Sequence, residues 1–447
     1  MRTKKRTSVV IMIIIVPILA ILAMAGIFFL PSLDWRKPEI VLTPDIDIIG
    51  HHQTFNVGLT ARKSGLKQIQ ITITQKDKKQ ILTDISYDKR ETYTQKISLV
   101  LDSLQMELTD GPATLEIIVK SFSWLRRKAV LTKNVSIDLI PPQIFLLNTT
   151  THVNPGGTCV SLFRASKPVM EAGVFVNETF FRAYPVTVSG KPCYLSYFAI
   201  PMNANNRPPV IRAFIKDFGN NEASSGIPFI LKKKRFRHDK LNINDGFLQK
   251  KMPEFQITIP ELRDKTLIET FRHVNTVIRN DNLKTIQALC KQSQSKALWQ
   301  GSFLRLKDGA TMSLYGDHRV WLYSGQAIGE SFHEGVDFAS TAQAPVQAAN
   351  NGLVLFTGTI GIYGETVVID HGLGMISIYA HLSSISIAKG QMVNKGDIIG
   401  NTGLSGLAGG DHLHFSIMVG GQFVNPVEWL DSHWIADNVI KKTNISF

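Results

Sequence analysis

The stretch His412-Leu413-His414-Phe415-Ser416-Ile417-Met418-Val419 begins with alternating polar and apolar residues and ends in a nearly continuous apolar run. This pattern predicts a β-strand, in which residues two positions apart point to the same face. We therefore expect His412 and His414 to direct their imidazoles into one cleft, while Leu413 and Phe415 face a core. A histidine pair at this spacing is a weak signal for a metal site until further ligands join it.

Two more segments supply candidate ligands. His333-Glu334-Gly335-Val336-Asp337 combines a histidine with a carboxylate, and Tyr379-Ala380-His381-Leu382 adds another histidine. Gly335 argues against a helix, so the first segment is expected to be a loop that runs into a strand. A catalytic zinc site needs three His or carboxylate ligands and a fourth position open to water. His333, Asp337 and one of the paired histidines can fill these positions, which leaves the other histidines free to move protons.

Residues 311–430 resemble the lysostaphin-type zinc metallopeptidases, the M23 family of peptidoglycan-cleaving endopeptidases. Besides the three motifs, the resemblance rests on further stretches: 344–348 with 351–354, 361–369 with 371–372, 389–393 with 395–400, and 402–403. They resemble the family's first core hairpin, its central strand pair, the turn-rich segment that follows, and the approach to the His-Leu-His-Phe strand. The resemblance covers a little over a quarter of the chain and implies a C-terminal, antiparallel-β metallopeptidase domain.

The family pattern also implies a role for each motif residue. Carried over position by position, it makes His333, Asp337 and His414 the ligands of a Zn²⁺ ion. The same comparison makes His381 and His412 the catalytic histidines.

This chain departs from the family pattern at two places. The glycine-rich loop at 404–411 is a few residues longer than the family's common version, and because it borders the cleft it bears on substrate preference. Ser416 stands where many members carry Glu. A carboxylate that orients a ligand imidazole is therefore either missing here or supplied from elsewhere.

The N-terminal region predicts a membrane anchor. Residues 8–30 contain no charge, are rich in Ile, Leu, Val and Ala, and follow a flank with four basic residues. Their length matches the about 20 residues that a transmembrane helix needs, and the basic flank predicts an internal N-terminus with the rest exported. The alternative is a signal peptide cleaved after Ala23-Met24-Ala25. We favour the anchor, since the apolar run continues past that site, and expect a single-pass protein of the bacterial inner (cytoplasmic) membrane.

The remaining sequence predicts a mainly β chain with an N-terminal transmembrane helix. Short alternating runs at 68–74 and 113–119 have the spacing of a β-sandwich, and Pro141-Pro142 marks a boundary. A second strand-rich unit ends in a turn at 217–221 that resembles bacterial immunoglobulin-like modules; one larger β domain is the alternative. We predict a basic flank and anchor at 1–33, β domains at 38–140 and 141–232, a basic and helical linker at 233–300, and the zinc peptidase domain at 301–433.

Apolar residues at helical spacing predict a short amphipathic helical pair within the linker. They are Leu267, Phe271, Val274 and Ile278, then Leu283, Ile286 and Leu289, with a break expected at 280–282. The pair could pack on the catalytic domain, act as a spacer, or occlude the cleft.

Net charge and cysteine content give little information about the protein's binding partners or its cellular compartment. The net charge of +13 fits either attraction to an anionic wall or membrane surface, or plain solubility. No pattern indicates nucleic-acid binding. Cys159, Cys193 and Cys290 form no Cys-x-x-Cys motif, and an oxidising compartment would allow the first two to pair.

The sequence therefore predicts a membrane-anchored, zinc-dependent endopeptidase that hydrolyses peptide cross-links of bacterial peptidoglycan, with its catalytic domain in the periplasm. The expected partners are peptidoglycan stem peptides, the inner membrane, and envelope proteins that bind the β domains. The alternative is a non-catalytic envelope scaffold that activates cell-wall amidases; the complete ligand set argues against it. A third hypothesis is an enzyme held inactive until its helical segment or its β domains move.

Overall fold

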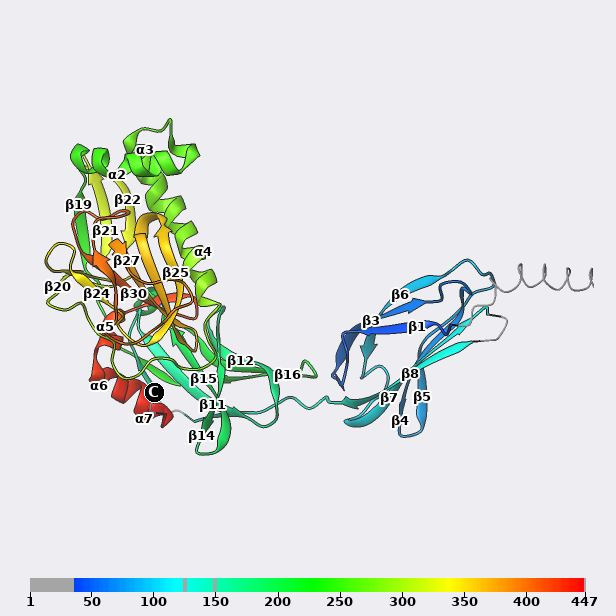
Figure 1. Cartoon of the computed structure of the whole chain (residues 1–447). Coiled ribbons are helices and arrows are strands. Elements are labelled where there is room, and N and C mark those ends of the chain that lie inside the picture. Colours follow the sequence, from blue (N-terminus) through cyan, green and yellow to red (C-terminus); the bar gives the residue numbers. More distant parts are fainter. Residues whose placement is uncertain (1–35, 124–126, 148–150, 446–447) are drawn as a thin grey trace, which may run out of the picture. The chain divides into compact units, whose positions relative to one another are not determined.

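The computed structural model describes residues 36–123, 127–147 and 151–445, and it is mainly β with few helices, as expected (Figure 1). The predicted membrane segment at 8–30 lies outside the described residues. Within the described ranges, no helix is long and apolar enough to cross a membrane. By their contacts, these residues form two compact units: one runs up to Pro141 and includes Lys216–Glu222, and the other contains Pro142–Ile215 and everything from Ala223 onward.

The first unit contains two sheets with alternating burial. Strands β1, β3 and β6 form one sheet, and the other has the order β2-β8-β7-β4-β5. Along β7 every second side chain is buried, which is the period of a strand with one face on a core. The strands are β1 Glu39–Thr43, β2 Ile48–Ile49, β3 His52–Thr60, β4 Leu66–Gln75, β5 Lys78–Ser86, β6 Thr94–Asp102, β7 Gly111–Ser121 and β8 Lys128–Ile137.

The second unit begins with two four-stranded sheets of order β14-β15-β11-β9 and β13-β12-β16-β17. Their core is continuous with that of the C-terminal sheet, and Glu428 adds polar contacts between the two parts. Its carboxylate accepts from the Thr158 amide at 2.7 Å and from the Asn154 side chain at 3.1 Å. The elements are β9 Ile144–Leu146, β10 Thr151–Val153, β11 Thr158–Ala165, β12 Val169–Val176, β13 Thr179–Arg182, β14 Tyr184–Val188, β15 Lys191–Ala199, η2 Met202–Asn205, β16 Ile211–Asp217, β17 Glu222–Gly226 and β18 Phe229–Leu231.

All three cysteines are free and buried. The strand register explains why Cys159 and Cys193 do not meet: Cys159 lies opposite Phe198 on β15, whereas Cys193 lies opposite Val186 on β14. Cys193 therefore lies five positions along β15 from the residue opposite Cys159, which is far beyond the reach of a disulfide.

The C-terminal part of the chain forms a ten-stranded sheet whose main path is β20-β23-β30-β27-β26-β25-β28. Antiparallel pairing puts Asp337 of β23 opposite His414 of β30, and His414 opposite Ala380 of β27. Three adjacent strands thus carry the motif residues. The elements are β20 Ala310–Ser313, β23 Val336–Ala339, β24 Pro345–Gln347, β25 Gly352–Ile360, η5 Gly361–Tyr363, β26 Gly364–Gly372, β27 Met375–Ile385, β28 Met392–Val393, β29 Ile398–Thr402, β30 Leu413–Val419, β31 Gln422–Val424, α5 Pro426–Leu430, α6 Ser432–Ile435, η6 Ala436–Ile440 and α7 Lys441–Thr443.

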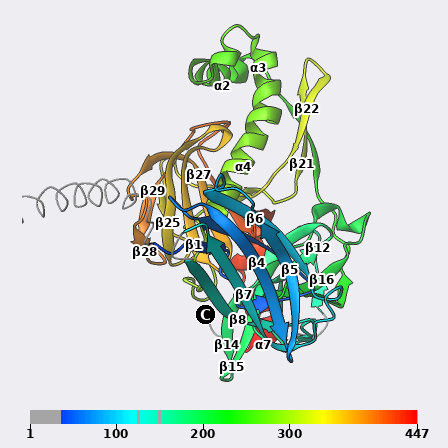
Figure 2. The ribbon, with the colours of Figure 1, turned by 90° about the vertical axis from the view of Figure 1, so that its right-hand side faces the viewer.

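A separate three-stranded sheet and a helical segment belong to the same unit. The sheet has the order β19-β21-β22, with β19 at His238–Asn242, β21 at His318–Tyr323 and β22 at Gln326–Phe332. The helices are α2 Asp245–Thr258, η3 Pro260–Leu262, α3 Leu267–His273, the π-helix η4 Val274–Ile278, and α4 Arg279–Cys290. In Figure 2, α4 descends from α2 and α3 along the sheet that contains β25.

The break predicted at 280–282 is wrong, because the helix continues through these residues into α4. The helical spacing itself is confirmed, since Phe271, Val274 and Ile286 are fully buried. Asn282 does not break the helix because its side-chain oxygen accepts the backbone N–H of Ile362 at 2.9 Å. Asn282 thus connects the helix to the turn η5 through a hydrogen bond.

Candidate metal centre

Three side-chain atoms from two strands and one loop converge on a single point. His333 Nε2 lies 2.9 Å from Asp337 Oδ1 and 3.0 Å from His414 Nδ1, and the last two atoms are 2.9 Å apart. All three residues are buried. In a tetrahedral zinc site with bonds of ~2.0–2.1 Å, ligand atoms stand roughly 3.3 Å apart. The observed triangle needs only a small expansion to accept such an ion.

The hydrogen bonds behind the two imidazoles determine which nitrogens carry protons. His333 Nδ1 faces the carbonyl of Leu314 at 3.0 Å and must donate to it. Ser416 Oγ donates to the carbonyl of Glu334 at 2.8 Å, so it accepts from His414 Nε2, also at 2.8 Å. In a neutral imidazole the opposite nitrogen is then free of a proton. We assign both tautomers on these partners.

It follows that three buried lone-pair donors face one another with no hydrogen between them. The atoms are His333 Nε2, His414 Nδ1 and Asp337 Oδ1, and burial lowers the pKa of His414 to about 4, which keeps that imidazole neutral. Uncompensated acceptors at this separation repel, whereas a cation at their centre would be bound by all three. The donor set fits a zinc ion, with two nitrogens and one carboxylate oxygen.

The sequence departure at position 416 has a structural answer. Ser416 stands where many members of the resembled family carry Glu, and its hydroxyl orients the His414 ring by linking it to the backbone of Glu334. Gly335 makes this close packing possible, since a Cβ there would lie 2.5 Å from Ser416 Oγ and 2.7 Å from the His414 ring. A serine and a glycine together replace the missing carboxylate.

His381 is directed into the cleft by a local irregularity of β27. Between Tyr379 and Leu382 this strand uses one residue more than its partner β26, which is a β-bulge. The backbone of His381 accordingly has a φ of 62°, a left-handed conformation that is uncommon for residues other than glycine. Its Nδ1 donates to the carbonyl of Ser405 at 2.9 Å, which leaves Nε2 unprotonated. Burial lowers the pKa of His381 well below its usual value.

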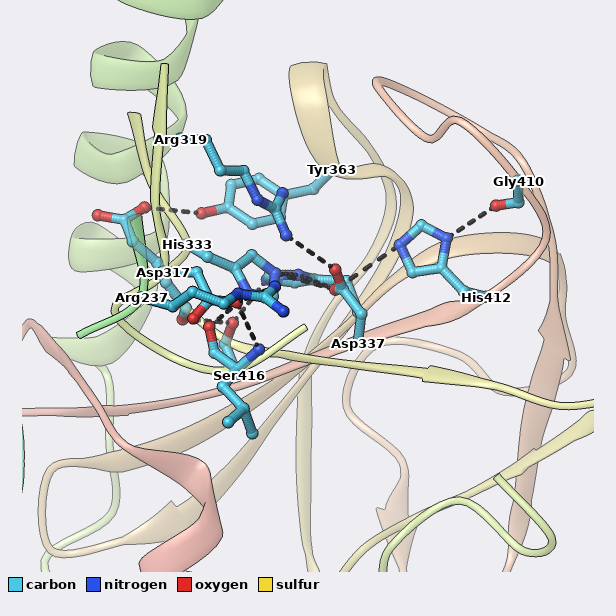
Figure 3. Close-up of polar contacts among 12 residues, drawn as sticks. Arg237, Asp317, Arg319, His333, Asp337, Tyr363, Gly410, His412 and Ser416 are labelled. Atoms are coloured by element: carbon cyan, nitrogen blue, oxygen red, sulfur yellow. Dashed lines mark hydrogen bonds and ion pairs between the residues drawn. The ribbon is translucent and has the colours of Figure 1, made fainter. Parts of the chain in front are cut away.

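His412 immediately precedes β30 and lines the same cleft as His381. Its Nδ1 donates to the carbonyl of Gly410 at 2.7 Å, and its Nε2 lies 3.6 Å from Asp337 Oδ1 (Figure 3). The rings of His381 and His412 are 4.8 Å apart between centroids. The same-face placement predicted for His412 and His414 is therefore observed, and all five motif residues meet at one site.

Asp337 uses its second oxygen for a contact that the motifs did not reveal. Arg319 Nη2 lies 3.3 Å from Asp337 Oδ2, opposite the approach of His412 (Figure 3). The carboxylate thus stays ionised and keeps Oδ1 free to bind a cation.

The cleft is a cavity of about 310 Å³ with two walls of different origin. One wall comes from the C-terminal sheet and carries the five motif residues. The other comes from β19, β21, α2 and α4, and its lining residues are Leu241, Phe247, Arg279, Arg319 and Trp321. Neither Arg279 nor Arg319 lies in a recognisable motif, so no local signal in the sequence could have identified them.

Two other histidines near the motifs have different surroundings. His371 is buried between the Asn351 carbonyl and the Ser377 hydroxyl, each at 2.7 Å, and does not reach the cleft. His318 contacts His238 at 3.0 Å and Glu330 at 3.1 Å.

Comparison with known proteins places the similarity in the same region. Residues 331–426 match the model of peptidase family M23. The chain is 43% identical over 95 residues to DD-carboxypeptidase/endopeptidase Mpg of Neisseria meningitidis, covering 21% of this chain and 22% of that protein. It is 40% identical over 96 residues to peptidoglycan DD-endopeptidase ShyA of Vibrio cholerae, covering 22% of each.

Among solved structures, the catalytic domain of the antimicrobial peptidase lysostaphin from Staphylococcus simulans is 28% identical, with a TM-score of 0.25. The match covers 28% of this chain and 94% of that one. The chain spans only about a fifth of the length of the two curated relatives. The match to the family model confirms the resemblance expected from the motifs, and it is confined to the C-terminal part of the chain.

Proposed function

We propose a function from one premise: residues 331–426 are a domain of peptidase family M23. The chain is a zinc-dependent endopeptidase that hydrolyses peptide cross-links in bacterial peptidoglycan. The observation that carries this proposal is the triangle of three unprotonated, buried ligand atoms on His333, Asp337 and His414. A scaffold that had lost catalysis would have no need to retain it.

The residues around the triangle supply the rest of the chemistry. A bound zinc ion provides Lewis acidity, which activates water and polarises the scissile carbonyl. His381 and His412 each donate Nδ1–H to a backbone carbonyl, so that Nε2 of each can accept a proton in the cleft and return it to the leaving amine. Because the pKa of His381 is lowered, this imidazole is unprotonated at neutral pH and ready to accept.

The substrate and the location rest on different observations. Mpg and ShyA are named as DD-peptidases, which supports the D-alanyl cross-link between stem peptides as the bond that is cut. The uncharged run at 8–30 after a basic flank supports a single membrane anchor, with the catalytic domain in the periplasm. We also propose that the β domains are immunoglobulin-like. In this proposal they bind other proteins of the cell envelope.

Zinc analysis of the purified protein tests the metal centre. Wild-type protein should hold one zinc ion per chain, and His414→Ala should lose most of its affinity, because three protein ligands are the minimum for a catalytic site. His433→Ala, at an exposed histidine outside the cleft, is the matched control and should bind as the wild type does. Stoichiometric zinc that survives in His414→Ala would refute the ligand assignment.

A further inference from the structure

Arg279 brings a positive charge into the cleft, where Glu334 acts on it electrostatically but forms no ion pair with it. It is the first residue of α4 and lines the cavity together with the motif histidines. Its Nη2 donates to Asn275 Oδ1 at 3.0 Å, while its Nε is enclosed and has no hydrogen-bond partner. Among the described residues, no carboxylate pairs with this guanidinium at ion-pair distance. Enclosing a cation without a partner is costly, so a partner from outside is expected.

Two asparagines on either side of Arg279 in the chain hold this part of the helix in place. Asn275, which orients the guanidinium, is itself held because its amide donates to the carbonyl of Glu330 on β22 at 3.0 Å. Asn282 holds the next turn of α4 against Ile362. These two contacts hold the helix between the hairpin β21–β22 and the catalytic sheet, and the bond to Asn275 directs the guanidinium from there.

The charge balance of the cavity favours an anionic ligand. Two guanidinium groups, Arg279 and Arg319, face two carboxylates, Glu334 and Asp337. The charge of a bound zinc ion is therefore left without compensation. A peptide that brings a carboxylate into the cleft would supply it.

We infer that Arg279 is a substrate-binding residue that pairs with a free carboxylate within about one residue of the scissile amide. The inference rests on the proposed endopeptidase function and adds the chemistry that the cleft selects. Arg279 lies outside residues 331–426, so this subsite is contributed by the helical segment, not by the matched domain. The guanidinium suits the task, since it presents several donors in one plane to the two oxygens of a carboxylate.

Two carboxylates of a D-alanyl cross-link could fill this subsite, and amidation separates them. One lies on the amine-side residue, when this is a diamino diacid, and the other ends a stem peptide. The probes are synthetic cross-linked peptides with both carboxylates free, or with one or the other converted to a carboxamide. Cleavage of each probe is measured for wild type, Arg279→Gln, Arg279→Lys, and Arg272→Gln as an exposed control on the same helical segment.

Wild type should cleave one of the two amidated probes with a kcat/KM about 10- to 100-fold below that of the free acid, mostly through KM, as expected for one lost charge-assisted hydrogen bond. Arg279→Gln should lose a similar factor on the free acid and no longer distinguish the two probes. Arg279→Lys should recover part of the preference, and Arg272→Gln should match wild type. Equal cleavage of all probes by wild type would overturn the inference and leave the endopeptidase function intact. This result needs only the wild-type protein, so it remains decisive even if Arg279→Gln does not fold.

Calorimetric binding of the amine-side product peptide, with both carboxylates free or with one or the other amidated, separates the two claims. Binding requires no turnover. If wild type binds the free acid more tightly than one of its two amides, and Arg279→Gln does not, the subsite stands even when no probe is cleaved. If the affinity changes neither when the peptide is amidated nor when Arg279 is replaced, the inference is contradicted whatever the catalytic result.

Discussion

Ser416 shows how one residue can orient a proposed metal ligand in place of the carboxylate that many members of the resembled family carry. Its hydroxyl connects His414 Nε2 to the backbone of Glu334, and this fixes the tautomer that leaves Nδ1 free. The five motif residues were predictable because each lies in a short segment with its own local pattern. Arg319 and Arg279 were not, since they reach the site from elements whose sequences carry no such pattern.

Ser416→Ala should lower zinc affinity by roughly 10- to 100-fold, the usual effect of removing a partner that orients a ligand. Without the hydroxyl, the His414 ring loses the acceptor that holds Nε2–H and is free to rotate or to change tautomer. Competition with a chromophoric chelator measures the affinity. Ser384→Ala removes an exposed hydroxyl from the edge of the same sheet and is the control. An unchanged affinity in Ser416→Ala would show that the backbone alone orients His414.

At the scale of elements, the strand β27 combines regular pairing with one bulge. Met375–Leu382 are all buried, so no alternation along this strand indicates which face lies on the core. The bulge at His381 was not predictable, since it depends on how β26 and β27 are paired by the rest of the sheet. The same holds for α4: its apolar spacing predicted a helix, but only the contact of Asn282 with η5 explains why three polar residues do not interrupt it.

His371, where β26 ends, predicts a pH dependence of stability. Burial lowers its pKa from 6.5 to about 4, so between these values the unfolded chain binds a proton that the folded chain does not. The free energy of unfolding should therefore fall as pH drops from 6.5 towards 4, by up to roughly 3 kcal/mol for a fully buried group. Denaturant unfolding of wild type and His371→Asn across this range isolates the contribution, and the variant should have the flatter profile. Parallel profiles would contradict this role; His433→Asn serves as the exposed control.

For the whole molecule, the sequence predicted a mainly β chain but not how the parts join. The matched domain and strands β9–β16 share one apolar core, and Glu428 bonds to Thr158, 270 positions away; no local pattern encodes such contacts. The segment expected to be a basic and helical linker packs into a second core beside the cleft. Its helices therefore form one wall of the proposed active site.

The proposed anchor makes a prediction about topology. If residues 8–30 span the membrane, everything beyond Pro31 is exported, and protease added to spheroplasts should digest the C-terminal domain. A cytoplasmic marker protein should stay intact in the same sample. A C-terminal domain that resists protease until the membrane is dissolved would refute export. A mature N-terminus at Gly26 would refute only the anchor.

Digestion of purified, cross-linked peptidoglycan tests the central claim most directly. Zinc-loaded protein should convert cross-linked dimers into monomers with a new amine at the former D-alanyl bond, as read by mass analysis. A chelator should abolish the reaction and added zinc should restore it. His381→Ala should retain zinc and fold while losing about 10²–10⁴-fold in rate, the range for a positioned acid–base group. Dimers that persist with zinc-loaded wild type, or cleavage that is insensitive to the chelator, would contradict the account.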